Sequence, residues 1–517
     1  MQRNLALSLS TALLIGLSFA PLPLGFLSYV ALIPFLLLLN DLSLKESFRW
    51  GYITGFFISS FTIYWIVFPT SFGVIAALLV HSLYYAIFAI LYHHIIRVSQ
   101  SIALIAVPFL WTAIEYIRSL GELGFPWVSL GYTQSYYTSL IQYVEYTSVY
   151  GVSFWVCIIN VCLFYMYLKR DKNVHLTIGA ASLLLLFLVP LLFKVNNTGY
   201  GQDPAKKVRV AIIQGNIDPY QKWEKENRER SFFIYDSLST AVGKDNVDLI
   251  IWPETATPAY LLRSRQKLPW VTGLVEKLNT PIFTGTPDYE WIDKINYKSY
   301  NSITLIDKKE GPFDVYSKMR LVPFGERIPY QDFFFFIKIL LSKFNLGEGN
   351  FSPGDSLKLF QIKLRQNSGK KIEIGGVICF ESIFPEFVGT MVKKGAEIIV
   401  ILTNDGWYKR TGAPYQHAQM AVFRAIENRI DIARCANTGI SMTIDKFGTI
   451  RKETGIFEKA VIIDEIETRN RLTFFTKHGH VFANVVSIAA LLILIFTYFF
   501  ETYLIDDKNN STARKTN

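Results

Sequence analysis

The sequence predicts a membrane protein in two parts: a bundle of eight transmembrane helices, and an α/β domain inserted between the seventh and eighth helices. Of the 517 residues, 51% are hydrophobic, and the mean hydropathy of +0.26 is high for a wholly soluble protein. The apolar excess is concentrated in 1–195 and 480–501, in stretches close to the ~20 residues that a helix needs to cross a bilayer. Between these regions, 207–470 alternates apolar strands with amphipathic helices, as an α/β sheet does.

Each predicted crossing is one apolar segment. The segments are 4–20, 24–39, 51–68, 73–96, 102–119, 149–168, 176–193 and 481–500. The first could be misread as a cleavable signal peptide that ends at Ala20. Because Pro21 and a second apolar segment follow at once, we expect a retained pair of helices.

Basic residues in the short loops predict the orientation. They lie in loops of one side of the predicted bundle, at Arg3, Lys45, Arg49, Arg97, Lys169, Arg170, Lys172, Lys508, Arg514 and Lys515. The short loops of the other side hold only Arg118. By the positive-inside rule, both termini, including a tail over 502–517, are cytoplasmic and the insert lies outside. The net charge of +10 is then explained by topology and anionic lipid, so nucleic acid is not an expected partner.

One membrane segment carries ionisable residues. Trp111, Glu115 and Arg118 follow at i, i+4 and i+7, on one helical face. Two interpretations remain open: the charges face a cavity, or Glu115 and Arg118 form an interfacial pair that satisfies itself. The following 124–127 turn, with Trp127, is typical of a rigid aromatic element at the membrane interface.

Three strand ends in the insert carry groups that complement one another. Glu254 ends an apolar strand within 247–255, Lys318 lies in 315–326, and Cys379 ends the strand that begins at Lys371. A carboxylate can take a thiol proton, and an ammonium can stabilise a thiolate or an oxyanion. Taken singly, each has an ordinary alternative: a buried apolar thiol, a helix cap or salt-bridge partner, and a surface charge. The four cysteines do not suggest disulfides, and with the histidines they show no zinc-ligand spacing, so no metal is expected.

Several motifs carry a resemblance to known proteins. WPE ends at Glu254, YSKMRLVPFGE covers 316–326, ICFE covers 378–381 and TNDGW covers 403–407. These resemble the nitrilase superfamily with its Glu–Lys–Cys triad. Over nearly its whole length the chain resembles the membrane branch of that superfamily, the apolipoprotein N-acyltransferase family. The resemblance implies an αββα sandwich for 207–470, in a bacterial inner membrane protein whose catalytic domain is periplasmic.

The resemblance also implies roles. Cys379 is the nucleophile, Glu254 the general base and Lys318 the electrostatic stabiliser. The expected supporting or substrate-binding residues are Glu326, Phe380, Glu381, Trp223, Trp127, Glu115 and Arg118. The acyl donor is a membrane phospholipid, typically phosphatidylethanolamine, and the acceptor is the α-amino group of a diacylglyceryl-cysteine on an apolipoprotein. A thioester keeps the acyl group activated, so no cofactor is needed, and we expect a monomer.

Some features depart from the family pattern or leave alternatives open. Phe380 stands where the family commonly has Tyr, and Tyr408–Lys409 stand where Phe–Gly is commoner. The apolar stretch 328–351 is either a mobile arm over the acyl path or a buried helix. His417 is interpreted as structural. Two other functions remain: a membrane-tethered hydrolase that uses the same triad, and a transporter or lipid-binding receptor whose outer domain is inactive.

The charge pattern generates a first prediction. A reporter fused after Asn517 should read cytoplasmic, and one inserted near Asn197 should read external, because the basic loops hold one side of the bundle inside. Alkaline phosphatase and green fluorescent protein fusions measure this. The reverse pattern would overturn the topology.

Overall fold

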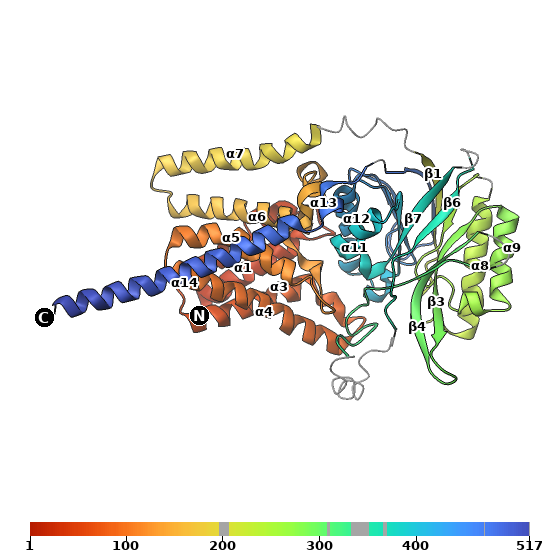
Figure 1. The fold of residues 1–517 in the computed structure, drawn as a ribbon, viewed down its shortest axis with the longest axis horizontal. Helices are drawn as coiled ribbons and strands as arrows, with labels where there is room; N and C mark the ends of the chain where they lie inside the picture. The colour runs from red at the N-terminus through yellow and green to blue at the C-terminus, as the bar shows by residue number, and fades with distance from the viewer. Residues whose placement is uncertain are drawn as a thin grey trace.

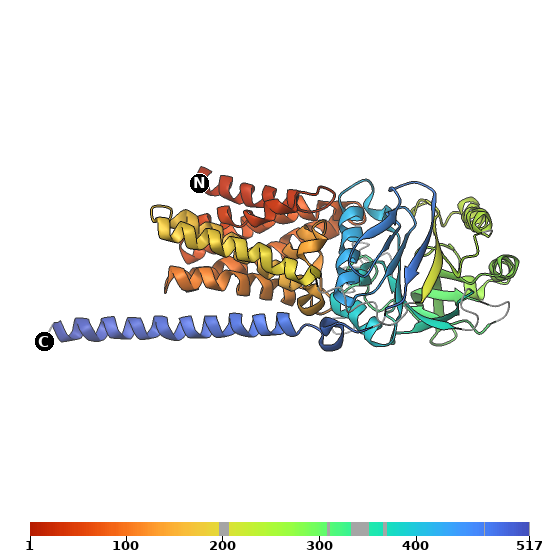
Figure 2. The same ribbon diagram turned by 90° about the horizontal axis from the view of Figure 1, so that it is seen from above.

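The computed structural model describes residues 1–195, 206–243, 245–307, 311–331, 351–365, 370–469 and 471–515. The molecule is elongated, with a helical bundle at one end and an α/β domain at the other (Figures 1 and 2). Both termini lie at the end of the bundle remote from the α/β domain. Most of the apolar stretch 328–351 falls outside the described residues.

The predicted apolar segments form the helices of the bundle. They are α1 (Gln2–Ser18), α2 (Ile33–Leu39), α3 (Leu44–Thr62), α4 (Ser71–Ile96), α5 (Gln100–Ile117), α6 (Val144–Leu168), α7 (Asn173–Val195) and α14 (Val481–Lys515). Within the described residues, five of these, α4 to α7 and α14, are long and apolar enough to cross a membrane. The segment 24–39 instead divides into a 3₁₀ turn, Gly25–Tyr29, and the seven-residue α2. Helix α14 continues through most of the predicted tail, to Lys515.

Helix α6 begins five residues before the predicted segment and is kinked at Ser148, whose φ is 58°. The kink has a partner in the α/β domain. Glu427 accepts a hydrogen bond from Ser148 Oγ at 2.7 Å and another from Val149 N at 3.0 Å. A carboxylate here satisfies a backbone N–H that the start of the next helical turn leaves unpaired. The domain therefore caps a membrane helix.

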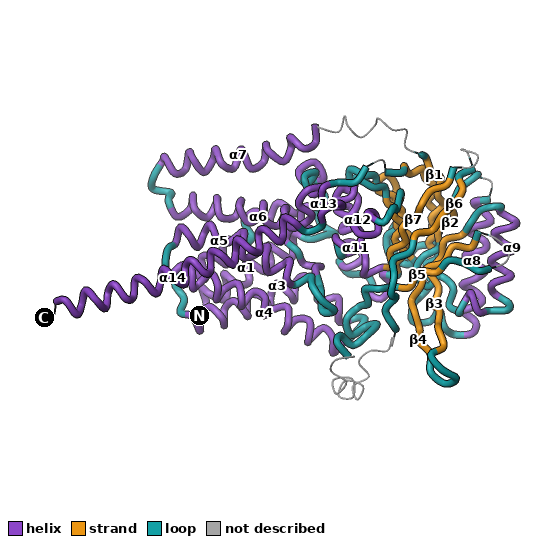
Figure 3. Tube along the Cα trace, viewed as in Figure 1, coloured by secondary structure: helices purple, strands orange, loops and turns teal. Residues whose placement is uncertain are grey.

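Two six-stranded sheets form the centre of the α/β domain. One contains β1 (Lys207–Gln214), β2 (Leu249–Ile251), β3 (Ile282–Trp291), β4 (Tyr297–Ile306), β5 (Val315–Ser317) and β12 (Ala460–Glu467), and the other contains β6 (Leu359–Lys363), β7 (Lys371–Ile378), β8 (Ile398–Thr403), β9 (Ile432–Ala436), β10 (Met442–Ile444) and β11 (Ile450–Glu453). Helices α8 (Lys225–Val242) and α9 (Lys267–Leu278) lie outside the first sheet. Helices α11 (Pro385–Lys393) and α12 (Ala413–Asn428) lie between the second sheet and the bundle (Figures 1 and 3). These layers are the αββα sandwich that the resemblance implies.

In each sheet, the directions of the strands bring the predicted site residues to the edge where β2 and β5, or β7 and β8, end. β2 and β3 are parallel, β4 is antiparallel to β3, and β5 is antiparallel to β4. β5 therefore runs in the same direction as β2, and their carboxyl ends share an edge. In the other sheet β7 and β8 are parallel, so their carboxyl ends also lie together. Residues that follow these four strands are the ones that a site can use.

Buried charge pairs join α12 to the bundle. Arg424 Nε lies 2.8 Å from Glu427 Oε2, with both side chains fully buried. Just beyond the helix, Arg429 Nε lies 2.9 Å from Glu145 Oε2 on α6, and Arg429 Nη2 donates to the backbone oxygen of Gln142 at 2.9 Å. Removing one partner of a buried pair leaves an uncompensated charge, which is strongly destabilising.

This coupling generates a second prediction. Glu427→Gln should lower the free energy of unfolding by about 3–5 kcal/mol, because Arg424 loses its buried counter-ion while the oxygen that accepts from Ser148 and Val149 is kept. Thermal unfolding in detergent micelles measures the effect. Glu226→Gln, at an exposed position of α8, is the matched control and should leave the midpoint unchanged. Equal midpoints for the two variants would contradict the coupling.

Candidate active site

Cys379 is the first residue after β7 and opens a 3₁₀ turn, Cys379–Ile383. Its φ is 47°, in the left-handed region that residues other than glycine rarely adopt. The side chain is 6% exposed. Strained backbone of this kind persists only where its surroundings enforce it, and it clusters at functional sites. A thiol held at a sharp strand end is therefore a candidate nucleophile.

Glu254 and Lys318 lie close together, as the strand directions require. Lys318 Nζ is 3.8 Å from Glu254 Oε1 and 2.8 Å from Glu326 Oε1. Asn301 on β4 donates from Nδ2 to both carboxylates, at 2.8 Å to Glu254 and 3.3 Å to Glu326. The Lys318 side chain is only 1% exposed. The structure thus places one buried ammonium between two carboxylates, with an amide bridging them.

The charges around Cys379 determine the protonation of its thiol. Burial raises the pKa of Cys379 well above its usual range, and the Glu254 carboxylate raises it further, while Lys318 opposes both. For Lys318, burial lowers the pKa, but Glu326, Glu254 and Cys379 outweigh it and the net shift is upward. The resting pair is therefore a neutral thiol beside an ammonium. Since only the thiolate is strongly nucleophilic, attack by this sulfur requires a base to remove its proton.

Glu381 ties two of these strand ends together. It is fully buried, and its Oε1 accepts from Tyr316 Oη at 2.6 Å and from the Met319 backbone N–H at 2.7 Å. Its Oε2 accepts from the Ile378 backbone N–H at 2.8 Å. Burial raises the pKa of Glu381 to about 7, against the opposing effect of these donors. The carboxyl group is thus placed to hold the Lys318 loop against the end of β7.

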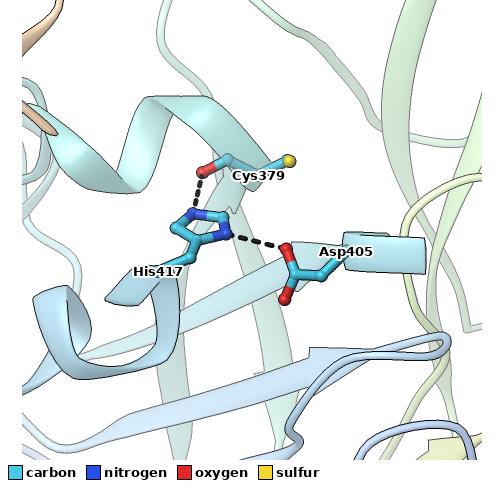
Figure 4. A group of neighbouring side chains, drawn as sticks. All are labelled: Cys379, Asp405 and His417. Carbon is cyan, nitrogen blue, oxygen red and sulfur yellow. Dashed lines mark hydrogen bonds and ion pairs between the residues drawn. The ribbon is translucent and has the colours of Figure 1, made fainter. Parts of the chain in front are cut away.

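His417 on α12 contacts the backbone of Cys379, as Figure 4 shows. Its Nε2 lies 3.2 Å from the Cys379 carbonyl oxygen, and its Nδ1 lies 2.8 Å from Asp405 Oδ1. Arg434 Nη2 donates to Asp405 Oδ2 at 2.7 Å. Burial raises the pKa of Asp405, but Arg434 and His417 outweigh it and hold it well below its usual range. Cys379, Asp405 and His417 are close enough to bind a metal ion, but the guanidinium already supplies the positive charge. The cluster therefore supports the Cys379 backbone.

Aromatic side chains from both parts of the chain pack beside the site. Trp127 lies 5.2 Å, centroid to centroid, from the His417 ring and 6.1 Å from Tyr408. Phe125 is stacked on both Trp127 and Phe380, at 6.0 and 6.3 Å. The interfacial turn predicted from the sequence is thus in contact with the residue that follows Cys379.

The other predicted supporting residues lie in different places. Glu115 is buried, and its Oε1 accepts from the Leu130 backbone N–H at 2.7 Å. Arg118 Nη1 lies 2.9 Å from His81 Nε2 on α4. Glu115 and Arg118 therefore form these hydrogen bonds with different partners. Trp223 is 43% exposed, on the loop after β1.

A separate cavity of about 900 Å³ lies in the bundle, between α5, α6, α7 and the start of α14. Its walls are mainly apolar and aromatic, with Trp155, Leu186 and Phe482 among them. None of the site residues described above lines it. The chemistry and this cavity therefore belong to different regions of the protein.

Sequence reasoning missed three polar residues of the site: Asn301, Asp405 and Arg434. Asn301 and Arg434 lie inside strands, where a polar side chain on a buried face is a signal that can be noticed. Asp405 is the second residue after β8 and opens the turn in which the chain leaves the sheet. That position could have marked it as a candidate.

Comparisons with known proteins identify relatives of both parts of the chain. A family model for the apolipoprotein N-acyltransferase N-terminal domain matches residues 11–162, and one for carbon-nitrogen hydrolases matches 209–471. The apolipoprotein N-acyltransferase of Chlorobaculum tepidum is 32% identical, over 95% of this chain and 96% of its own, and that of Geobacter metallireducens is 34% identical, over 93% of each. An amidase from Nesterenkonia sp. AN1 aligns with a TM-score of 0.37 and 15% identity, covering 53% of this chain and 96% of that chain.

The fold and site define a membrane-bound enzyme of the nitrilase superfamily, with a carbon-nitrogen hydrolase domain carried on a helical bundle. Residues 11–162, which match the apolipoprotein N-acyltransferase N-terminal domain, identify one family within this superfamily. The chain belongs to the apolipoprotein N-acyltransferase family.

The close approach of β3 to Glu254 generates a third prediction. A Cβ at Gly285 would lie 2.6 Å from Thr255 N and 2.7 Å from Glu254 Cα. Gly285→Ala should displace Glu254 and lower the rate of acyl transfer by about 100-fold, as small misplacements of reacting groups do. Acyl transfer in detergent measures this. Gly273→Ala on α9, where a Cβ meets nothing within 4 Å, is the control and should keep full activity. A fully active Gly285→Ala would contradict a requirement for this geometry.

Proposed function

We propose that this chain transfers a fatty acyl group from a membrane phospholipid to the α-amino group of a diacylglyceryl-cysteine at the N-terminus of an apolipoprotein, through a thioester on Cys379. The observation that carries the proposal is the pairing of Glu254 with Lys318, after β2 and β5 of one sheet, where both charges act on Cys379 at the end of β7 in the other sheet. Phe125 of the bundle packs beside this site, on Phe380. The family match supports the acyl acceptor and donor classes. Phosphatidylethanolamine is the proposed donor and a monomer the proposed active form.

In the first half-reaction, Glu254 takes the thiol proton as Cys379 Sγ attacks the ester carbonyl carbon. The Lys318 ammonium, with the Phe380 backbone N–H, stabilises the negative oxygen of the tetrahedral intermediate. The C–O bond then breaks, and the leaving glycerol oxygen takes the proton from Glu254. A lysophospholipid departs and the acyl group remains on the sulfur.

In the second half-reaction, the neutral α-amino group attacks the thioester carbonyl carbon, and Glu254 removes a proton from the attacking nitrogen. The C–S bond breaks and the thiolate regains that proton. The products are an amide and free Cys379, so the cycle needs no cofactor. Glu326, bonded to Lys318 at 2.8 Å, and Glu381 keep the ammonium and the two loops in place throughout.

We further propose that eight segments cross the membrane, with the α/β domain periplasmic and both termini cytoplasmic. Support comes from the basic loops and from the position of both termini at the bundle end remote from the α/β domain. Trp223, which is exposed on the loop after β1, and Trp127, which is buried against the His417 ring, are proposed substrate contacts. Arg118 and Glu115 are proposed to hold the interfacial turn that carries Trp127.

Two alternative functions are less well supported. A membrane-tethered hydrolase would give the acyl group to water and would need little of the bundle, whereas the match over 11–162 belongs to the acyltransferase N-terminal domain. A transporter or receptor with an inactive outer domain would not need Glu254, Lys318 and Cys379 together. Acyl transfer to an amine accounts for both parts of the chain.

The proposed thioester generates a fourth prediction. Purified protein incubated with phosphatidylethanolamine alone should gain the mass of one acyl chain, measured by intact-protein mass spectrometry. Cys379→Ala should lose the adduct and abolish transfer, because no sulfur remains to accept the acyl group. Glu254→Gln should also lose it, since the buried thiol then keeps its proton.

Cys435→Ala is the matched control. This cysteine is also buried, with its Sγ 3.4 Å from the Ile213 carbonyl oxygen, and its loss should leave the adduct in place. Substantial acylation of a lipoprotein peptide by Cys379→Ala would remove Cys379 from the mechanism. Release of free fatty acid with no amide product would favour the hydrolase.

A further inference from the structure

A second lysine lies beside Glu254 and has no part in the mechanism above. Lys222, on the loop after β1, is only 4% exposed. Its Nζ donates to the Thr255 backbone oxygen at 3.2 Å. Thr255 directly follows Glu254 and has a φ of 48°, in the left-handed region that is unfavourable for a β-branched residue. A buried ammonium therefore holds a strained peptide unit next to the proposed base.

The charged surroundings of Lys222 identify its electrostatic partner. Glu254 is the carboxylate that attracts it, and the Trp223 ring lies 5.6 Å from Nζ. Glu254 is in turn faced by Lys318 at 3.8 Å and by the Asn301 amide, with Glu326 beyond them. Lysine is almost never buried without a partner, because desolvation of its charge is costly. The cost at Lys222 is offset mainly at Glu254 and at the Thr255 carbonyl.

We propose that Lys222 is a positioning residue for Glu254, whose ammonium keeps the buried Glu254 carboxylate ionised and whose hydrogen bond fixes the peptide unit after it. This inference rests on the proposed function, since it assigns a role through the proposed base. A carboxylate can accept the thiol proton only when it is ionised. Without Lys222, Lys318 would have to neutralise Glu254 and Glu326 and also stabilise the developing oxyanion. Because Lys222 supplies a second positive charge near Glu254, Lys318 can interact with the substrate oxygen.

The charge of Lys222 is present in the range where it is needed. Burial lowers its pKa to about 8, with Glu254 opposing the shift. The side chain is thus protonated below about pH 8 and carries its positive charge through the acidic and neutral range. Loss of this cation makes protonation of Glu254 easier. The acid limb of the rate profile then moves to higher pH.

The test measures formation of the Cys379 acyl adduct from phosphatidylethanolamine in detergent micelles, between pH 4 and 8, with full-length protein. Lys222→Gln keeps a donor for the Thr255 carbonyl but removes the charge. Its acid limb should move upward by about one pH unit, the size expected when one neighbouring charge is lost. Lys222→Arg keeps the charge and should restore the wild-type limb. Lys225→Met, three residues along the chain and exposed, is the control and should leave the profile unchanged.

The outcomes separate the two proposals. A lower rate in Lys222→Gln with an unmoved acid limb would mean that the lysine only supports the loop, and would overturn its electrostatic role. Coincident profiles for all variants would overturn it too. If the wild-type protein forms no adduct at any pH, the proposed thioester itself fails, and the role of Lys222 fails with it.

Discussion

The site depends on the buried ammonium of Lys318, which would be costly without its two carboxylates. Glu326 at 2.8 Å and Glu254 at 3.8 Å supply the compensation, and their unequal distances separate their tasks. The nearer carboxylate, Glu326, holds the ammonium, while the farther one, Glu254, is the proposed proton acceptor. Asn301 bonds to both and keeps them from moving apart. Three ionisable groups can share one small buried volume because their charges are interdependent.

A third carboxyl group, that of Glu381, fixes the positions of chain segments, whereas Glu254 and Glu326 supply negative charge. Glu381 accepts hydrogen bonds from the Ile378 and Met319 backbones, and so joins the end of β7 to the loop that carries Lys318. Hydrogen bonds from backbone N–H groups hold the two chain segments in place whatever rotamers the side chains of Ile378 and Met319 adopt. Cys379 is held from the other side by His417. Its strained φ of 47° is thus enforced from two directions.

Much of this architecture could be predicted from local patterns. The apolar strands ending near Glu254 and Cys379 and the membrane helices are visible because their signals are short in range. The meeting of Glu254 with Lys318 is different, since it depends on β4 and β5 reversing direction in turn, which no local pattern encodes. The kink at Ser148 was also out of reach, because its acceptor is Glu427, far along the chain. Interactions between distant segments are where sequence reasoning stops and the family resemblance has to supply the rest.

Helix α12 explains why the two parts of the chain act as one enzyme. It carries His417, which holds the Cys379 backbone, and Glu427, which caps the kinked membrane helix α6. These contacts are ten residues apart on one helix, a distance of about 15 Å along its axis. A packed helix barely changes length, so the height of the sulfur is fixed relative to α6. Lipid-anchored substrates reach the site only at the depth where the bilayer presents them. A rigid link between the proposed nucleophile and the membrane helix is therefore part of the proposed catalytic apparatus.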